Sequence, residues 1–196
     1  RDDRDPHAEK LESYETDALT DRLIGFLAEY GNGPQPFFAV LSVQPPHNPH
    51  VAPPEYIQRH DPERIVLRPN VPDIPRIVER ERAELAGYYA QIENLDWNVG
   101  RIMAKLRDLG LEGTTHVVFF SDHGDMHGSH GYTRKSSPWE EAVCIPCIYR
   151  AAGGVRVSAE SDVPLNHVDF APTTLGLCGI SPPDWMQGTD LSHHIV

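Results

Sequence analysis

The sequence predicts an α/β fold in which helices cover a mostly parallel sheet. Three short, largely apolar segments predict its strands, at residues 37–43, 115–121 and 145–150. Such segments are typical of strands that are buried on both faces, as in parallel sheets. Between the first two strands, residues from about 80 to 109 carry apolar side chains at intervals of three and four, which predicts a long helix. Because strand, helix and strand follow in this order, we expect a layered α/β domain.

The first predicted element is a helix at residues 16–30. Its apolar residues recur on one face: Leu19, Leu23, Phe26, Leu27 and Tyr30. Thr16 or Asp17 is suited to cap its N-terminus, and the glycine- and proline-rich segment 31–36 ends it. After the first strand, residues 44–75 are rich in proline and show little periodicity. We therefore expect a long loop there, and loops of this length are usually functional.

The second half of the chain continues the pattern. GLEG ends the long helix, the second strand follows, and residues 168–180 predict a shorter helix that ends at Gly179. Cys144 and Cys147 form a CxxC next to the third strand. A redox pair or half of a zinc site is one interpretation, but no second CxxC completes a zinc site. We therefore interpret these cysteines as small residues of a buried strand.

Composition excludes some classes of function. The chain has 196 residues, enough for one domain with its own core. Its formal net charge is -12, and no basic stripe is present, which argues against nucleic-acid binding. The apolar runs are far too short to span a membrane. The chain opens RDDRDPHAEK, without a signal peptide, so we expect it to be part of a longer protein.

Two polar segments follow predicted strands. SVQPPHNPH, with His47, follows the first strand, and SDHGDMHGSHG, with Asp122 and His123, follows the second. Because functional groups gather beyond the carboxyl ends of parallel strands, we expect these three residues at the same edge of the sheet.

Asp122 and His123 have the chemistry of metal ligands. A carboxylate and an imidazole side by side can reach one divalent cation if the backbone turns, and Gly124 permits a turn. Such ligands suit Mg²⁺, Mn²⁺ or Zn²⁺ better than Ca²⁺. A turn-capping aspartate beside a surface histidine is the alternative interpretation. His127 and His130 lie in the glycine-rich segment, where either could join the site, but we expect them to support it or to be exposed. We expect His50, His60 and His116 to be exposed.

Residues from about 14 to 192 resemble the later half of the catalytic domain of sulfatases, in the alkaline-phosphatase-like superfamily. The matching blocks occur in the family's order: PFFAVLSVQPPHNPHVAPPEY, YYAQIENLDWNVGRIMAKLRDLGL, VVFFSDHGDMHGSHG, WEEAVCIPCIYR, VDFAPTTLGLCGI and MQGTDLS. Histidine at position 123 resembles the phosphonate-monoester-hydrolase and choline-sulfatase side of the family, whereas many sulfatases have asparagine there. The resemblance implies a layered α/β/α fold.

The resemblance also implies roles for four residues. Asp122 and His123 resemble the pair that ligates the catalytic divalent metal, Ca²⁺ by family, with Mg²⁺ or Mn²⁺ as alternatives. His47 resembles the histidine that contacts the transferred sulfuryl group and its leaving oxygen, and Lys135 the lysine that contacts the sulfate oxygens. The implied substrate is a small-molecule or carbohydrate sulfate ester.

One departure from the family pattern limits these expectations. The formylglycine nucleophile of sulfatases arises in a Cys-x-Pro-x-Arg or Ser-x-Pro-x-Arg motif, and the 196 residues contain neither. We therefore expect residues 1–196 to be a partial catalytic domain that is inactive by itself, with the nucleophile in an N-terminal half. Two alternatives remain open: a phosphonate monoester or phosphodiester hydrolase, and a non-catalytic α/β fragment with a partial metal site.

Overall fold

The computed structural model describes residues 13–153 and 160–195, and these form two compact units. The first unit contains residues 13–110 and 126–134, and the second contains the other described residues. The acidic residues among positions 1–6, which we do not assign to a metal site, lie outside the described residues. Within the described residues, no helix is both long and apolar enough to span a membrane.

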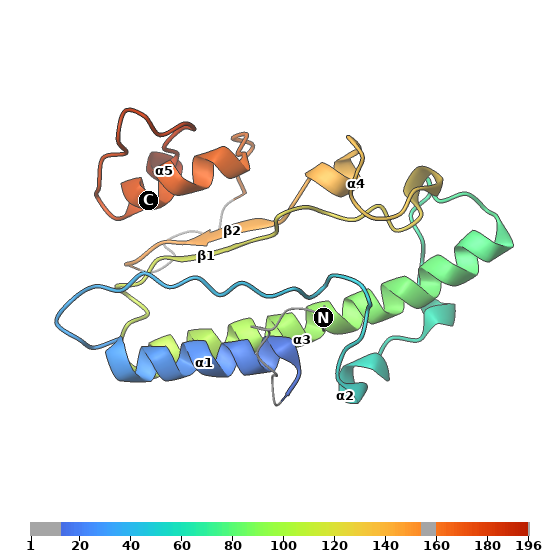
Figure 1. Ribbon diagram of the computed structural model, residues 1–196, viewed down its shortest axis with the longest axis horizontal. Coiled ribbons are helices and arrows are strands. Elements are labelled where there is room, and N and C mark those ends of the chain that lie inside the picture. The colour runs from blue at the N-terminus through green and yellow to red at the C-terminus, as the bar shows by residue number, and fades with distance from the viewer. Residues whose placement is uncertain (1–12, 154–159, 196) are drawn as a thin grey trace, which may run out of the picture. The chain divides into compact units, whose positions relative to one another are not determined.

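The first unit is built on two helices. α1 (Glu15–Tyr30) lies along α3 (Pro75–Asp108), as Figure 1 shows. Both predicted helices are confirmed, but the expected cap at Thr16 or Asp17 is wrong, because α1 already begins at Glu15. α3 begins at a proline, whose fixed φ suits the first helical position. Lys105 and Arg107 in its last turn face the negative end of the helix dipole.

A polar contact joins the two helices. The side-chain amides of Asn94 and Asn98, both fully buried on α3, donate to Oδ1 of Asp17 at 2.9 and 2.7 Å. Buried amides are costly when they lack an acceptor, so Asp17 stabilises the pairing of α1 with α3.

Replacing Asp17 by alanine should therefore lower the free energy of unfolding by about 1–3 kcal/mol, because the buried amides of Asn94 and Asn98 each lose one acceptor. Urea denaturation of the full-length protein, followed by circular dichroism, measures this change. Asp21→Ala is the matched control: Asp21 also joins α1 to α3, but through an exposed ion pair with Arg101. Its loss should cost less than about 1 kcal/mol. Equal effects of the two substitutions would contradict the prediction.

The proline-rich segment 44–75 is ordered by packing on α3. It contains α2 (Pro54–Ile57) and a 3-10 turn, η1 (Pro62–Arg64). Two small apolar clusters hold it against the helix. One contains Ala52, Tyr56 and Ala90, and the other Ile65, Leu85 and Ala86. The expected long loop is thus present, with two short helical turns inside it.

The glycine-rich segment 126–134 also belongs to the first unit. It contains the 3-10 turn η2 (Ser129–Gly131). The backbone N–H of His130 donates to the carbonyl oxygen of Asn70 at 2.9 Å, and Arg68 donates to that of Met126 at 3.4 Å. Met126 is fully buried. This segment is therefore packed against the rest of the unit.

The second unit contains a small sheet. β1 (Val117–Phe120) pairs with β2 (Cys147–Arg150), and the register runs from Val117 opposite Arg150 to Phe120 opposite Cys147. The helices of this unit are α4 (Glu140–Val143) and α5 (His167–Leu177), followed by a 3-10 turn, η3 (Ser192–His194). Phe170 of α5 stacks on Phe120 with ring centroids 4.0 Å apart. α5 therefore packs on the sheet, as expected for an α/β fold.

The described sheet departs from the parallel pairing that we expected. β1 and β2 are antiparallel. The connection between them contains the 3-10 turn η2 and the four-residue α4, and neither is long enough to serve as the crossover helix that parallel strands usually need. The expected strand at 37–43 is not a strand among the described residues. Phe38 and Val40 in it are 75% and 74% exposed, whereas a strand covered on both faces would bury them.

The cysteines are also placed differently from the expectation. Cys144 follows α4 and Cys147 begins β2, and both are exposed. They therefore lie in different elements and do not share a buried strand.

Candidate functional site

The Asp-His-Gly turn directly follows β1 in the second unit. β1 ends at Phe120, and Nε2 of His167 at the start of α5 donates to the carbonyl oxygen of Ser121 at 3.1 Å. The Ser121 hydroxyl in turn donates to the carbonyl oxygen of His123 at 2.6 Å. The turn that carries Asp122 and His123 is therefore held by one hydrogen bond from α5 and by one within the turn.

The hydrogen bonds of His123 define its tautomer. Nδ1 lies 2.8 Å from the carbonyl oxygen of Gly124. A carbonyl oxygen only accepts hydrogen bonds, so Nδ1 carries the hydrogen and Nε2 of the neutral ring carries a lone pair. Nε2 lies 3.5 Å from Oδ2 of Asp122, whose side chain is 83% exposed. A nitrogen lone pair and a carboxylate oxygen thus lie side by side, which is an arrangement suited to hold one cation between them.

Gly124 is required by a close approach of the backbone. Its N–H donates to the carbonyl oxygen of Ala142 at 2.9 Å. A Cβ atom at this position would lie 2.1 Å from the carbonyl oxygen of Glu141. Only glycine therefore lets the turn lie against the segment around α4.

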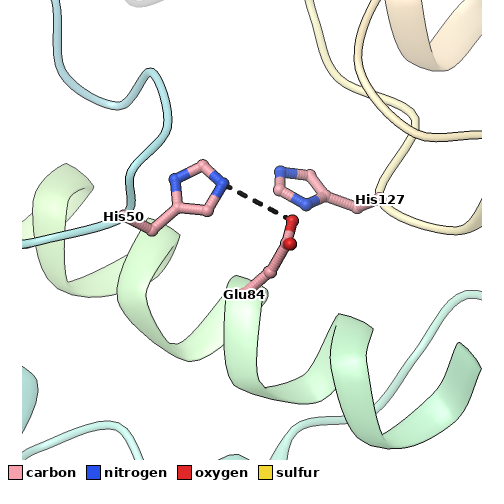
Figure 2. A group of neighbouring side chains, drawn as sticks. All are labelled: His50, Glu84 and His127. Atoms are coloured by element: carbon pink, nitrogen blue, oxygen red, sulfur yellow. Dashed lines mark ion pairs between the residues drawn. The ribbon is translucent and has the colours of Figure 1, made fainter. Parts of the chain in front are cut away.

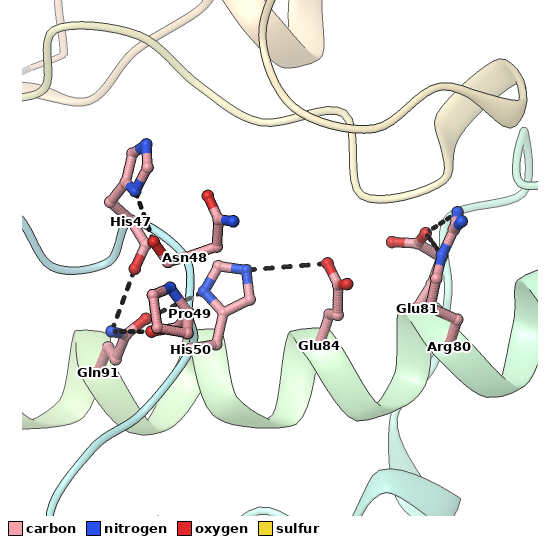
Figure 3. Close-up of polar contacts among 8 residues, drawn as sticks. All are labelled: His47, Asn48, Pro49, His50, Arg80, Glu81, Glu84 and Gln91. Atoms are coloured by element: carbon pink, nitrogen blue, oxygen red, sulfur yellow. Dashed lines mark hydrogen bonds and ion pairs between the residues drawn. The ribbon is translucent and has the colours of Figure 1, made fainter. Parts of the chain in front are cut away.

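The other two predicted site residues lie in different parts of the structure. Lys135 begins the second segment of the second unit and is half-buried. His47 belongs to the first unit, is exposed, and donates from Nδ1 to the carbonyl oxygen of Asn48 at 2.7 Å. Figure 3 shows its ring turned away from α3. Because His47 lies in a different unit from Asp122, His123 and Lys135, the convergence of all four residues stays a prediction.

A second cluster of potential ligands lies within the first unit. The ligand atoms of His50, Glu84 and His127 lie within 4.8 Å of one another. Figure 2 shows them converging from the proline-rich segment, from α3 and from the glycine-rich segment. His127 is 4% exposed and the His50 side chain 7%, so the expectation that His50 is a surface residue is wrong, and His127 is not exposed either. Sequence reasoning missed them because each lies in a different segment.

Comparison with known proteins decides the family. Residues 1–180 match the family described as Sulfatase. The chain belongs to the sulfatase family. This sulfatase chain is 35% identical over 202 residues to an ulvan-active sulfatase of Formosa agariphila, covering 99% of the chain and 38% of that protein. It is 31% identical to an endo-4-O-sulfatase of Bacteroides thetaiotaomicron, covering 87% of the chain and 35% of that protein.

Solved structures agree with this assignment. The yidJ protein of Bacteroides fragilis matches the sulfatase chain with a TM-score of 0.86 and 29% identity, covering 93% of the chain and 41% of that structure. A phosphonate monoester hydrolase of Silicibacter pomeroyi matches with a TM-score of 0.73 and 26% identity, covering 91% and 42%. The resemblance to sulfatases and the alkaline-phosphatase-like α/β fold are thus confirmed. The sulfatase chain spans about two fifths of the length of these relatives.

Proposed function

We propose that the full-length protein hydrolyses sulfate esters of carbohydrates. Family membership supports hydrolysis of a sulfate ester, and the names of the relatives that are 35% and 31% identical support a sulfated polysaccharide as substrate. The observation that carries the proposal is the Asp-His-Gly turn. Its carboxylate oxygen and its imidazole lone pair lie 3.5 Å apart in an exposed position beyond β1.

Asp122 and His123 fit a divalent cation. Metal–ligand distances of about 2.0–2.6 Å place two ligand atoms at right angles roughly 2.8–3.7 Å apart, and the observed 3.5 Å falls in this range. Ca²⁺ is the ion implied by the family, with Mg²⁺ or Mn²⁺ as alternatives. A cation bound there supplies electrostatic stabilisation of the negative charge on the sulfuryl oxygens.

His47 and Lys135 would act on the same sulfuryl group. The carbonyl oxygen of Asn48 keeps the hydrogen on Nδ1 of His47, so proton transfer takes place at Nε2. A proton held at Nε2 can pass to the leaving oxygen of the ester, which is general acid catalysis. The Lys135 ammonium group would bind the sulfuryl oxygens and offset the charge that develops on them.

The covalent nucleophile would come from outside residues 1–196, which we interpret as a partial catalytic domain. Neither Cys-x-Pro-x-Arg nor Ser-x-Pro-x-Arg occurs in the 196 residues. The exposed apolar side chains of Phe38, Val40 and Ile148 support this interpretation, because a larger domain would cover them.

Lys135→Ala should lower kcat of the full-length protein about 10²–10³-fold on 4-nitrophenyl sulfate, because a positive group beside the transferring oxygens is lost. Initial rates of nitrophenol release measure this effect. Lys105→Ala, at the end of α3, is the matched control and should change kcat less than about twofold. An unchanged rate for Lys135→Ala would contradict the role of this lysine.

Phosphonate monoester hydrolysis is the second candidate function. It is favoured by the 26% identical neighbour of that activity and by histidine at position 123. The kcat/KM values of the full-length protein on 4-nitrophenyl sulfate and on 4-nitrophenyl phenylphosphonate separate the two. A value at least tenfold higher on the phosphonate ester would replace the sulfatase proposal by this one.

A further inference from the structure

We propose that His50, Glu84 and His127 form a second metal site, which binds a divalent transition metal ion such as Zn²⁺. These residues do not include Asp122 or His123. The site would join three segments of the first unit: the proline-rich segment, α3 and the glycine-rich segment.

The distances leave room for an ion between the side chains. Nε2 of His50 lies 3.9 Å from Oε2 of Glu84, which is too long for a direct hydrogen bond. All three ligand atoms lie within 4.8 Å of one another. Ligands at about 2.0–2.1 Å from a tetrahedral Zn²⁺ are about 3.3 Å apart, so small side-chain movements complete the site.

One face of α3 is shaped for this cluster. Glu84, Gly87 and Gln91 recur at intervals of three and four residues, so they lie on the same face of the helix. A Cβ atom on Gly87 would lie 2.4 Å from the backbone oxygen of His50. The glycine therefore lets His50 approach the helix between Glu84 and Gln91, as Figure 3 shows for the labelled side chains.

Gln91 turns the ligand nitrogen of His50 toward the cluster. The Gln91 side chain is 2% exposed, and its Nε2 lies 3.3–3.5 Å from the backbone oxygens of His47, Pro49 and Val51. These acceptors orient the amide, so its Oε1 faces Nδ1 of His50 at 3.0 Å. Oε1 only accepts, hence Nδ1 carries the hydrogen and Nε2 has the lone pair. Metal-binding histidines are commonly oriented in this way by a partner on the other nitrogen.

His127 is held in an unfavourable backbone conformation. Its φ is 40°, in the left-handed region that residues other than glycine seldom adopt. The ring packs edge-on against Tyr88 with centroids 4.5 Å apart, and it lies 5.5 Å from the His50 ring. Strained conformations of this kind concentrate at functional sites, and here the strain places an imidazole beside the His50–Glu84 pair.

The ligand types select the ion. Two imidazoles and one carboxylate suit Zn²⁺ and related transition metals, whereas Ca²⁺ and Mg²⁺ prefer oxygen ligands. The Glu84 side chain is 45% exposed, so the fourth coordination position can be open to water. The two buried histidines and the exposed carboxylate therefore describe a site that a metal can enter from solvent.

The test is zinc binding by the full-length protein after chelator treatment, with Ca²⁺ and Mg²⁺ in excess. Wild type should bind one Zn²⁺ more than the Glu84→Gln variant, or should bind that ion at least tenfold more tightly. Saturating Zn²⁺ should raise the Tm of wild type by at least about 3 °C. Glutamine has nearly the same shape as glutamate, and the Glu84 side chain is half-exposed, so the Glu84→Gln variant should fold. His127→Leu should also lose this ion.

Glu93→Gln is the matched control. Glu93 lies on the same helix and pairs with His60 at 3.0 Å, but this pair belongs to none of the three-ligand groups among the described residues. It should keep the zinc affinity and the Tm rise of wild type. Equal zinc affinities of wild type and the Glu84→Gln variant would overturn the proposal, and so would zinc binding that occurs only at millimolar Zn²⁺. The cluster would then be a packing contact between two buried histidines and a carboxylate.

Discussion

Replacing Asp122 by asparagine in the full-length protein should lower kcat/KM for a sulfate ester at least about 10³-fold. Asparagine has nearly the same shape but lacks the negative charge that holds a cation beside His123, and the stabilisation of the sulfuryl oxygens is lost with the cation. The rate of 4-nitrophenyl sulfate hydrolysis measures the effect, and the Ca²⁺ content of the purified protein measures its cause.

Asp162→Asn is the control for this experiment. Asp162 is an exposed acidic residue of the same unit, and its replacement removes the same charge without touching the turn beyond β1. It should change kcat/KM less than about twofold. If Asp122→Asn keeps both the bound metal and the rate, Asp122 is not a ligand, and the alternative of a turn-capping aspartate is correct.

Replacing Gly124 by alanine should lower kcat/KM at least about 10²-fold. The added Cβ would lie 2.1 Å from the backbone oxygen of Glu141, so the turn has to move, and misplacements of about 1 Å are enough for losses of this size. The same clash should cost about 1–3 kcal/mol of folding free energy. Kinetics at saturating Ca²⁺ and urea denaturation measure the two effects.

Gly113→Ala is the matched control, since a Cβ on Gly113 meets nothing within 4 Å in the same unit. It should leave kcat/KM within about twofold of wild type and change stability by less than about 0.5 kcal/mol. If the Gly124→Ala variant has the kinetics and stability of wild type, the close approach between the turn and α4 does not position the site.

The sequence alone determined the features that depend on neighbouring residues. Apolar side chains at intervals of three and four predicted α1 and α3, because a helix buries one face of a short stretch of chain. The pair Asp122–His123 is likewise local. Its Oδ2 and Nε2 atoms lie close together because the two residues are adjacent, and the order of the sequence blocks is enough to indicate the sulfatase family.

Only the tertiary structure decided the features that join distant segments. The antiparallel pairing of β1 with β2 depends on how the chain returns between them, and apolar runs of the same length fit either direction of pairing. The His50–Glu84–His127 cluster depends on the packing of two loops on α3. Each of these side chains looks ordinary in its own segment. The periodicity of apolar residues shows which face of a single helix or strand is buried. A site that is assembled from several segments depends instead on contacts between residues far apart in the chain.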